Sequence, residues 1–367
     1  MENNPQLSKE NVNRYLCDNC GGNMVFDPKQ GKLACPYCGF SKSIESDASR
    51  IVERDFHSFL KPEAERLQPL ATDAMQVSCA SCGATVVFVP PITATACDFC
   101  GGKIVAQPKA ADPLVAPEGV LPFSFTNQQA VSSLKNWTSS RWFAPSKLKT
   151  LADHDKADSV YLPYWTFDSY TSTEYTGQRG DDYRETETYT ENGEQKERSV
   201  TKTRWYGASG NVQRQFDDIA VPATKSVLPK YLERLNWNFG ELVSYEPAYL
   251  SGHKAQTYQV SLEEGFERYK QIAENVIRSD VRRDIGGDKQ QIDSLNTNYS
   301  DVTFKHLLVP VYASAYKFNN KVYQVVINGR TGEVQGERPY SWAKIAGLTL
   351  AILFVILLIV LISSMMR

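Results

Sequence analysis

Eight cysteines, arranged as four Cys-x-x-Cys pairs, constrain the fold of this 367-residue chain more than any other feature of its sequence. All eight lie before residue 101. Four disulfides are the other arrangement open to eight cysteines, but close pairs followed by a long cysteine-free remainder are not typical of a small secreted scaffold. The polar segment Met1–Asn13 also lacks the apolar core of a signal peptide. The spacing therefore predicts two metal sites, whose ligands are Cys17, Cys20, Cys35 and Cys38, and Cys79, Cys82, Cys97 and Cys100.

The two groups of four cysteines are copies of one small module. Fourteen residues separate Cys20 from Cys35, and fourteen separate Cys82 from Cys97. The whole pattern recurs with an offset of 62 residues, and a glycine directly follows every pair. Glycine tolerates the left-handed backbone that closes such a turn. The repetition indicates an internal duplication of one zinc ribbon.

The predicted metal sites are structural rather than catalytic. Two cysteines in a tight turn can present both thiolates to one ion, and two such turns joined by a hairpin complete a closed tetrahedral site of four thiolates. A closed site has no open position for water or a substrate. Roughly thirty residues cannot form a sufficient hydrophobic core, so metal binding should supply the folding energy of each ribbon. We therefore expect two structural Zn²⁺ ions per chain and no other cofactor.

The charge of the ribbons argues against a nucleic-acid surface. Residues 1–110 hold eleven Lys and Arg against twelve Asp and Glu, and tetrathiolate sites with bound metal would add further negative charge. The sequence of the ribbons lacks the basic stripe with interleaved aromatic residues that a nucleic-acid surface needs. The whole chain is also nearly balanced, with a formal net charge of -2. Protein–protein recognition is therefore the expected use of the ribbons.

An apolar segment near the C-terminus predicts a transmembrane helix. Ile345–Ile362 contains eighteen residues without a charge, which is just long enough to cross the hydrocarbon core of a bilayer. A buried helix of a soluble domain would have a polar face, and this segment has none. Tyr340 and Trp342 stand where an interfacial aromatic belt is expected. Arg338 and Lys344 precede the segment, so the positive-inside rule favours a tail anchor with a cytosolic N-terminus. Reduced, metal-bound cysteines agree with a cytosolic location.

The middle of the chain predicts a β-rich domain with a few helices. Seventeen of the nineteen tyrosines lie between Tyr161 and Tyr340, and aromatic residues favour the half-buried surface of a sheet. The expected fold class is therefore α+β. The predicted divisions are ribbon 1 at residues 14–44, ribbon 2 at 76–106, a linker at 107–118, a β-rich α+β domain at 119–340 and a transmembrane helix at 343–363.

Two helices of this middle domain can be predicted from local patterns. Helical spacing with an N-cap at Thr126 predicts a helix that extends to Ser140. A capping box formed by Ser261 and Glu264 predicts a second helix that extends to Val281. The apolar face of the second helix is expected to hold Phe266, Tyr269, Ile272, Val276 and Ile277.

Strands are predicted on either side of turn residues. Asn192-Gly193 between two threonine-rich segments is the strongest short hairpin signal, and because both faces of this hairpin are polar we expect an exposed arm. His306–Tyr316 and Lys321–Ile327 predict a second strand pair. The segment Ile51–Leu60 is short and amphipathic, and we expect it to pack beside the ribbons.

No catalytic motif is present in the sequence. The phosphate-binding loop G-x-x-x-x-G-K-[ST] is missing, and so are H-E-x-x-H, G-x-S-x-G and G-x-G-x-x-G. The four histidines, at positions 57, 154, 253 and 306, are isolated. We therefore expect no catalytic residues, no small-molecule substrate and no enzymatic activity.

Several longer motifs resemble a known group of proteins. They are LPFSFTNQQA and RWFAP within residues 121–145, YLPYWTFDSYT and YTGQRG within 161–180, and the whole of 306–341. Together with the two ribbons and the apolar helix, they resemble a bacterial family of membrane-anchored zinc-ribbon proteins of the transcription factor IIB type. Its members are often labelled primosomal protein N′ (replication factor Y) or helicase-like, and the missing nucleotide-binding loop does not support that label here. The resemblance implies an association with SPFH-domain or phage-shock-type envelope-stress systems.

Two functions are compatible with these features. The first is a single-pass adaptor of the bacterial inner (cytoplasmic) membrane, whose cytosolic domains recruit a cytosolic or membrane-associated protein such as an SPFH-domain or phage-shock-type protein. The alternative is a membrane-tethered nucleic-acid-binding protein, related to replication or transcription and without helicase activity. The acidic ribbons favour the adaptor.

Overall fold

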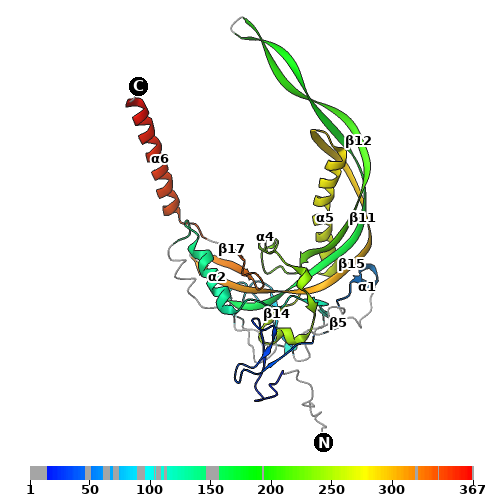
Figure 1. Cartoon of the computed structure of the whole chain (residues 1–367), viewed down its shortest axis with the longest axis vertical. Coiled ribbons are helices and arrows are strands. Elements are labelled where there is room, and N and C mark those ends of the chain that lie inside the picture. The colour runs from blue at the N-terminus through cyan, green and yellow to red at the C-terminus, as the bar shows by residue number, and fades with distance from the viewer. Residues whose placement is uncertain are drawn as a thin grey trace.

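Strand β11 (Asp158–Glu191) runs through the whole body of the protein in the computed structural model (Figure 1). It pairs antiparallel with β15 (Lys289–Phe318) along one edge and with β12 (Glu194–Pro222) along the other. Near its start it also pairs, in parallel, with β14 (Lys254–Gln256). Within the described residues these strands belong to a sheet of twelve strands, and helices lie against it. The predicted α+β class is confirmed.

The other elements are shorter. The structure describes residues 15–45, 51–60, 67–68, 74–88, 96–102, 104, 109–110, 114–145, 157–191, 194–318, 321–337 and 339–365. The remaining strands are β1 (Val25–Asp27), β2 (Lys32–Ala34), β3 (Ser41–Lys42), β4 (Arg54–Asp55), β5 (Leu67–Gln68), β6 (Met75–Ser78), β7 (Thr85–Phe88), β8 (Lys109–Ala110), β9 (Leu114–Val115), β10 (Gly119–Val120), β13 (Val243–Ser244), β16 (Lys321–Asn328) and β17 (Val334–Gly336). The helices are α1 (Phe56–Phe59), α2 (Asn127–Ser139), α4 (Pro229–Leu232), η3 (Phe239–Glu241), η4 (Pro247–Leu250), α5 (Leu262–Ile285) and α6 (Trp342–Met365).

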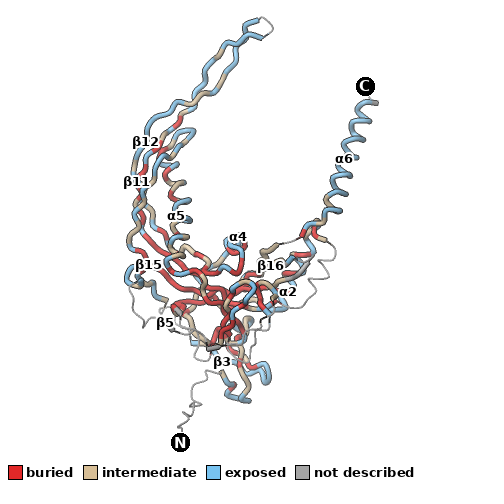
Figure 2. Tube along the Cα trace, turned by 180° about the vertical axis from the view of Figure 1, so that it is seen from behind, coloured by how far each residue is buried: buried red, intermediate tan, exposed pale blue. Residues whose placement is uncertain are grey.

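The far end of the β11–β12 hairpin forms an arm, defined here as residues 181–204. Strand β15 reaches β11 only as far as Gly180, so beyond that point β11 and β12 pair with each other alone. The arm is largely exposed on both faces and extends well beyond the body (Figures 1 and 2). Cross-strand ion pairs such as Lys202–Glu185, at 3.0 Å, take the place of a hydrophobic core. The predicted exposed hairpin is confirmed, and its Asn192-Gly193 turn lies outside the described residues.

Helix α5 lies along the concave face of the long strands (Figure 1). Ser261 caps the helix, because its hydroxyl accepts a hydrogen bond from the Glu264 N–H at 3.1 Å. The Glu264 carboxylate pairs with Lys225 at 3.0 Å instead of closing the predicted capping box. Gly286, with φ at 66°, follows the last helical residue as its C-cap. The predicted helix is confirmed and is one turn longer than expected.

One face of α5 packs on the sheet through residues spaced mainly four apart. The Tyr269 ring lies 5.4 Å from the Phe167 ring and 6.0 Å from the Phe216 ring, measured between centroids. The prediction for Ile272 is wrong, because Ile272 is 39% exposed. Its neighbour Ala273 continues the buried row instead. The buried residues of the helix are Leu262, Gly265, Tyr269, Ala273, Ile277, Val281 and Ile285.

The other predicted elements of the body are confirmed with different bounds. Thr126 caps α2 through a capping box with Gln129, which satisfies two backbone donors of the first turn. The strands predicted from His306 and Lys321 correspond to β15 and β16, which pair with each other antiparallel. Strand β15 begins much earlier than predicted, at Lys289.

The loop that follows α2 forms hydrogen bonds with the first turn of α6. The Ser341 N–H donates to the Phe143 carbonyl at 2.8 Å. The Lys344 ammonium donates to the Ala144 carbonyl at 2.7 Å. These bonds join the body to the start of the apolar helix, which then extends away from it (Figure 1).

The prediction that residues 51–60 pack beside the ribbons is wrong. Strand β4 pairs with β15, and the Phe56 ring of α1 lies 4.5 Å from the Phe266 ring of α5. The amphipathic pattern gives this segment one buried side chain, Phe56, which is 4% exposed. The amphipathic pattern alone does not show which surface covers Phe56. In the structure that surface is the aromatic cluster under α5.

At Gly265 helix α5 approaches β11 so closely that an added Cβ would lie 2.7 Å from the Trp165 ring. At an open helical site, Gly→Ala would add about 1 kcal/mol of stability. We expect Gly265→Ala to lower the Tm of the detergent-solubilised protein instead, because overpacking costs about 1–3 kcal/mol. Ser279→Ala, on the exposed face of the same helix, is the control and should leave the Tm nearly unchanged. An equal or higher Tm for Gly265→Ala would contradict this packing.

Candidate metal centres

The eight cysteines lie in four turns that share one backbone geometry. In the first turn the Cys17 N–H donates to the Gly22 carbonyl, and the Gly21 N–H donates to the Cys17 carbonyl, both at 2.8 Å. The same two bonds recur in the other three turns. Each turn contains a glycine with φ between 68° and 76°, a backbone conformation that other residues rarely adopt. These glycines, Gly21, Gly39, Gly83 and Gly101, follow the second cysteine of each pair, as the sequence indicates.

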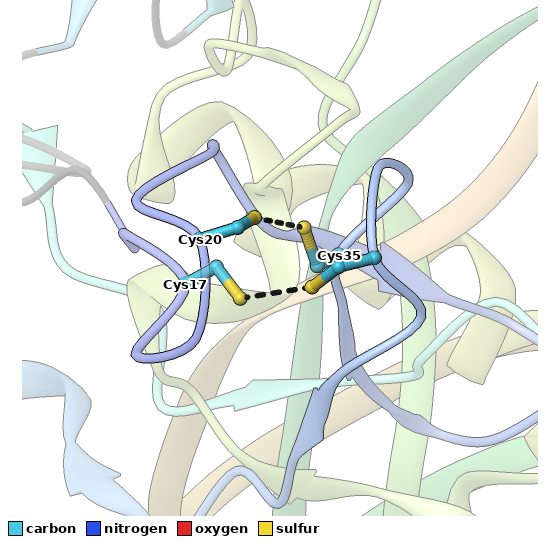
Figure 3. Close-up of side chains that lie close together, drawn as sticks. Cys17, Cys20 and Cys35 are labelled. Carbon is cyan, nitrogen blue, oxygen red and sulfur yellow. Dashed lines mark hydrogen bonds between the residues drawn. The ribbon is translucent and has the colours of Figure 1, made fainter.

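The four sulfurs of each group lie close enough to share one metal ion. In ribbon 1, Cys17 Sγ lies 3.5 Å from Cys38 Sγ, and Cys20 Sγ lies 3.5 Å from Cys35 Sγ (Figure 3). The corresponding separations in ribbon 2 are both 3.6 Å. All four sulfurs of each group lie within 4.8 Å of one another. Four thiolates about 2.3 Å from a tetrahedral ion would be about 3.8 Å apart, so both groups fit a metal ion.

The same separations are inconsistent with disulfides. A disulfide bond is about 2.05 Å long, and all eight cysteines are free thiols in the structure. Each sulfur faces a sulfur of the other turn in its own ribbon, as the dashed lines in Figure 3 show for ribbon 1. The two turns of a ribbon therefore converge on one centre, which is the arrangement of a closed metal site.

Backbone amides favour the thiolate form of one sulfur in each group. The Phe40 amide lowers the pKa of Cys38 to about 6. Burial acts to raise the pKa of Cys79, but the amides of Cys82 and Ser81 outweigh it and lower that pKa to about 7. Metal binding must remove the protons of the remaining thiols, so the affinity for metal falls as the pH falls.

Ribbon 1 is mounted on the surface of the body. Its strands β1, β2 and β3 form a separate three-stranded sheet. The Phe26 N–H donates to the Ser251 carbonyl at 2.9 Å, and the Phe26 ring packs edge-on against Tyr249 at 5.4 Å. Two of its cysteines, Cys20 and Cys38, are exposed. The cysteine group of ribbon 1 therefore lies outside the central sheet.

Ribbon 2 is built into the central sheet. Its strands β6 and β7 pair with each other, and β7 pairs with β14, the neighbour of β11. Cys79 and Cys97 are buried in one hydrophobic cluster with Leu121 and Val160 of the body. The predicted division into domains stays a prediction, but this cysteine group is part of the main core.

A buried ion pair joins ribbon 2 to the strand beside it. The Lys254 ammonium lies 2.6 Å from Asp98 Oδ1, and the two side chains are 10% and 2% exposed. Asp98 stands in the turn between Cys97 and Cys100. Burial raises the pKa of Asp98 to about 6 in spite of the attraction of Lys254. Removing one partner of such a pair leaves a buried charge and typically costs about 3–5 kcal/mol, so the pair fixes the position of ribbon 2.

Two of the histidines are buried. The sequence does not predict their burial, because an isolated histidine gives no signal of where it lies. His253 stacks on Phe123 at 4.5 Å, and His306 Nδ1 lies 2.7 Å from the Val115 carbonyl. Burial lowers the pKa of both histidines to about 4, so both are neutral at pH 7. The position of His306 in the apolar run HLLVPVY is the signal that could have indicated its burial. His154 lies outside the described residues.

Lys305 is a second buried cation among the described residues of the body. Its ammonium lies 2.7 Å from Asp218 and 2.9 Å from Glu53, with Asp168 at 3.7 Å. Burial acts to lower the pKa of Lys305, but these carboxylates outweigh it and hold the pKa above its usual value. A lysine that stays charged is a poor nucleophile. The cluster joins β11, β12 and β15, which carry Asp168, Asp218 and Lys305. Within the described residues, the groups of three or more potential metal ligands are the two cysteine groups.

Helix α6 is exposed along its length. Residues Trp342–Ser364 are long and apolar enough to cross a membrane, and their apolar window is 0% buried. The helix is therefore compatible with single-pass membrane anchoring. At its root Trp142, Tyr340 and Trp342 are 74%, 55% and 82% exposed. Aromatic residues at this position are typical of a membrane interface, and Trp142 adds a third to the two that the sequence indicates.

Comparison with known proteins finds a distant relative. The chain is 26% identical over 334 residues to a protein of Bacillus subtilis (strain 168) named "Uncharacterized protein YdjG". The similarity covers 90% of this chain and 92% of that protein, so it is not confined to the ribbons. No family model matches the chain, and no solved structure matches it.

The two ribbons offer a matched pair of substitutions, because Cys35 and Cys97 occupy equivalent positions. We expect the full-length protein to hold two metal ions, and Cys35→Ser and Cys97→Ser each to reduce this to about one. Cys97→Ser should lower the Tm of the body much further than Cys35→Ser, because ribbon 2 shares the central sheet and its core. Elemental analysis and circular dichroism during heating measure the two quantities. Equal Tm values for the two variants would contradict the difference in integration.

Proposed function

We propose that this protein is a membrane-anchored adaptor. In this proposal α6 holds the chain in the bacterial inner membrane, and the ribbons and body lie in the cytosol, where they recruit a soluble protein. The observation that carries the proposal is the combination of two saturated cysteine groups with an unburied apolar helix. Because every metal position is taken by a thiolate, the sites support a rigid surface rather than a reaction.

The proposed metal is Zn²⁺ in both ribbons. Tetrahedral sets of four thiolates select zinc or iron among the common metals of the cell. Zinc has no redox chemistry and is the usual ion of closed ribbons with four cysteine ligands. Elemental analysis of the purified protein separates zinc from iron.

Ribbon 1 is the proposed contact surface for the partner. It lies at the end of the body away from α6 (Figure 1). Its large apolar side chains Leu16, Tyr37 and Phe40 are 52%, 78% and 37% exposed. Exposed apolar side chains on a small, rigid module are typical of a protein-binding site. An SPFH-domain or phage-shock-type protein is the partner class that the sequence resemblance favours.

The charged arm restricts the orientation that the protein can adopt when α6 crosses a membrane. In Figure 1 the arm and α6 extend from the body in the same general direction. The arm carries charged side chains on both faces, and such a hairpin cannot enter the hydrocarbon. In a bilayer α6 must therefore lie at an angle to the arm that keeps the arm in water, while the bonds from Ser341 and Lys344 keep the first turn of α6 against the body.

The test of the adaptor is co-purification from solubilised membranes, followed by mass spectrometry. We expect a soluble protein that is retained by the full-length chain and lost from Tyr37→Ser/Phe40→Ser. The matched control is Tyr183→Ser/Tyr189→Ser on the arm, which changes two tyrosines of similar exposure to Phe40 and should retain the partner. Ending the chain before Trp342 should move the partner from the membrane fraction to the soluble fraction.

Three outcomes would revise the proposal. Loss of the partner from the arm variant alone would place the contact surface on the arm. Recovery of no soluble protein above an unrelated membrane protein would contradict an adaptor. Binding of DNA with a steep salt dependence would favour the membrane-tethered nucleic-acid-binding alternative.

A further inference from the structure

A cleft of about 820 Å³ opens at the root of α6. It lies between the end of α2, helix α4, strands β16 and β17, and the residues that lead into α6. Four cations line it, namely Arg141, Lys230, Arg234 and Lys321. Among its lining residues the one carboxylate is that of Glu337, which lies 3.7 Å from Lys321. The cleft therefore has a clear excess of positive charge.

Most of this charge is not neutralised by the residues that the structure describes. In the described part of the chain, Lys230 and Arg234 form no ion pair, and Arg141 Nε is buried without a hydrogen-bond partner. Aromatic rings support the cations by cation–π contacts without cancelling their charge. These contacts are Arg141 over Trp137 at 5.2 Å, Lys230 over Tyr231 at 4.8 Å and Lys321 over Tyr323 at 5.1 Å. Such a lining matches an anion.

The position of the cleft indicates where that anion comes from. Tyr340 and Trp342 line the cleft and are also the exposed aromatic residues at the root of α6. The hydrogen bond from Lys344 to the Ala144 carbonyl ties the loop that begins at Arg141 to the first turn of α6. Helix α4 lies on the side of the sheet from which α6 leaves (Figure 1). When α6 crosses a bilayer, the cleft is therefore held at the level of the lipid headgroups.

We propose that the cleft binds the headgroup of an anionic phospholipid, with Arg141, Lys230 and Arg234 as the phosphate ligands. A guanidinium group can form two parallel hydrogen bonds to a phosphate, and a lysine adds a point charge. The anionic lipids of the cytoplasmic leaflet attract basic segments next to a membrane helix. The inference rests on the proposed membrane anchorage by α6, and it adds a lipid site that the adaptor role does not require.

The test uses the full-length protein in detergent and counts retained lipids by native mass spectrometry. We expect phosphatidylglycerol to be retained and phosphatidylcholine, which has no net charge, to be lost. Arg141→Gln/Lys230→Gln/Arg234→Gln should weaken phosphatidylglycerol binding on the order of 100-fold. Arg198→Gln/Lys202→Gln/Arg204→Gln on the arm removes the same residue types and the same charge, and it should leave binding unchanged. An equal loss in both variants would overturn the proposal.

A soluble phosphate compound shares the chemistry of the headgroup, so a second arm separates the two sources. Inorganic phosphate and glycerol phosphate are titrated against the wild type in lipid-free detergent. Binding of either as tightly as phosphatidylglycerol would overturn the lipid assignment. Weak binding that depends on the three cleft cations supports it, since the acyl chains then supply the remaining affinity.

Folding and anchorage are measured on the same variants. Two metal ions per chain and an unchanged Tm show that the cleft variant is folded. Extraction of membranes with alkaline carbonate shows whether α6 is inserted. Release of the wild type by carbonate would reject the anchor and with it the proposed function. A wild type that is inserted but retains both lipids equally would reject the cleft site alone.

Discussion

The antiparallel pairing of β11 with β15 is the interaction on which the rest of the structure depends. It runs from Asp158 opposite Ala313 to Gly180 opposite Lys289. Ribbon 2 reaches it through β14, helix α5 covers its concave face, and the arm is its continuation beyond β15. A long ladder of backbone hydrogen bonds satisfies the polar groups of both strands, so their side chains can be buried on both faces near the middle of the sheet (Figure 2).

The two ribbons share one local structure but have different structural roles, because their surroundings differ. Their turns share the same backbone bonds and the same glycine conformation. Ribbon 1 contacts the body through Phe26 and keeps Cys20 and Cys38 at the surface. Ribbon 2 places Cys79 and Cys97 in the core and sends Asp98 to a buried lysine. The cysteine group that lies in a separate small sheet in the first copy is therefore part of the main hydrophobic core in the second.

Features set by neighbours in the chain could be predicted from the sequence, and features set by distant partners could not. The cysteine turns, the caps at Thr126 and Ser261 and the apolar helix depend on short-range rules, and the structure contains all of them. The packing of Phe56 under α5 depends on a surface more than two hundred residues away. The exposure of Ile272 depends on which face of α5 the sheet covers, and that face holds Ala273 instead. The cleft could not be predicted because it draws Arg141, Lys230 and Lys321 from three separate elements, and no spacing in the sequence relates them.

Three parts of this protein differ in how their charged side chains are paired, and this difference bears on function. In the body, buried cations are matched by carboxylates, as Lys254 is by Asp98. On the arm, exposed cations such as Lys202 pair across the strands with carboxylates such as Glu185, and such exposed pairs contribute little to stability. In the cleft at the root of α6, Lys230 and Arg234 have no such partner among the described residues. Two cations without an ion pair therefore face one cleft at the root of α6, and an external anion is the partner that suits their chemistry.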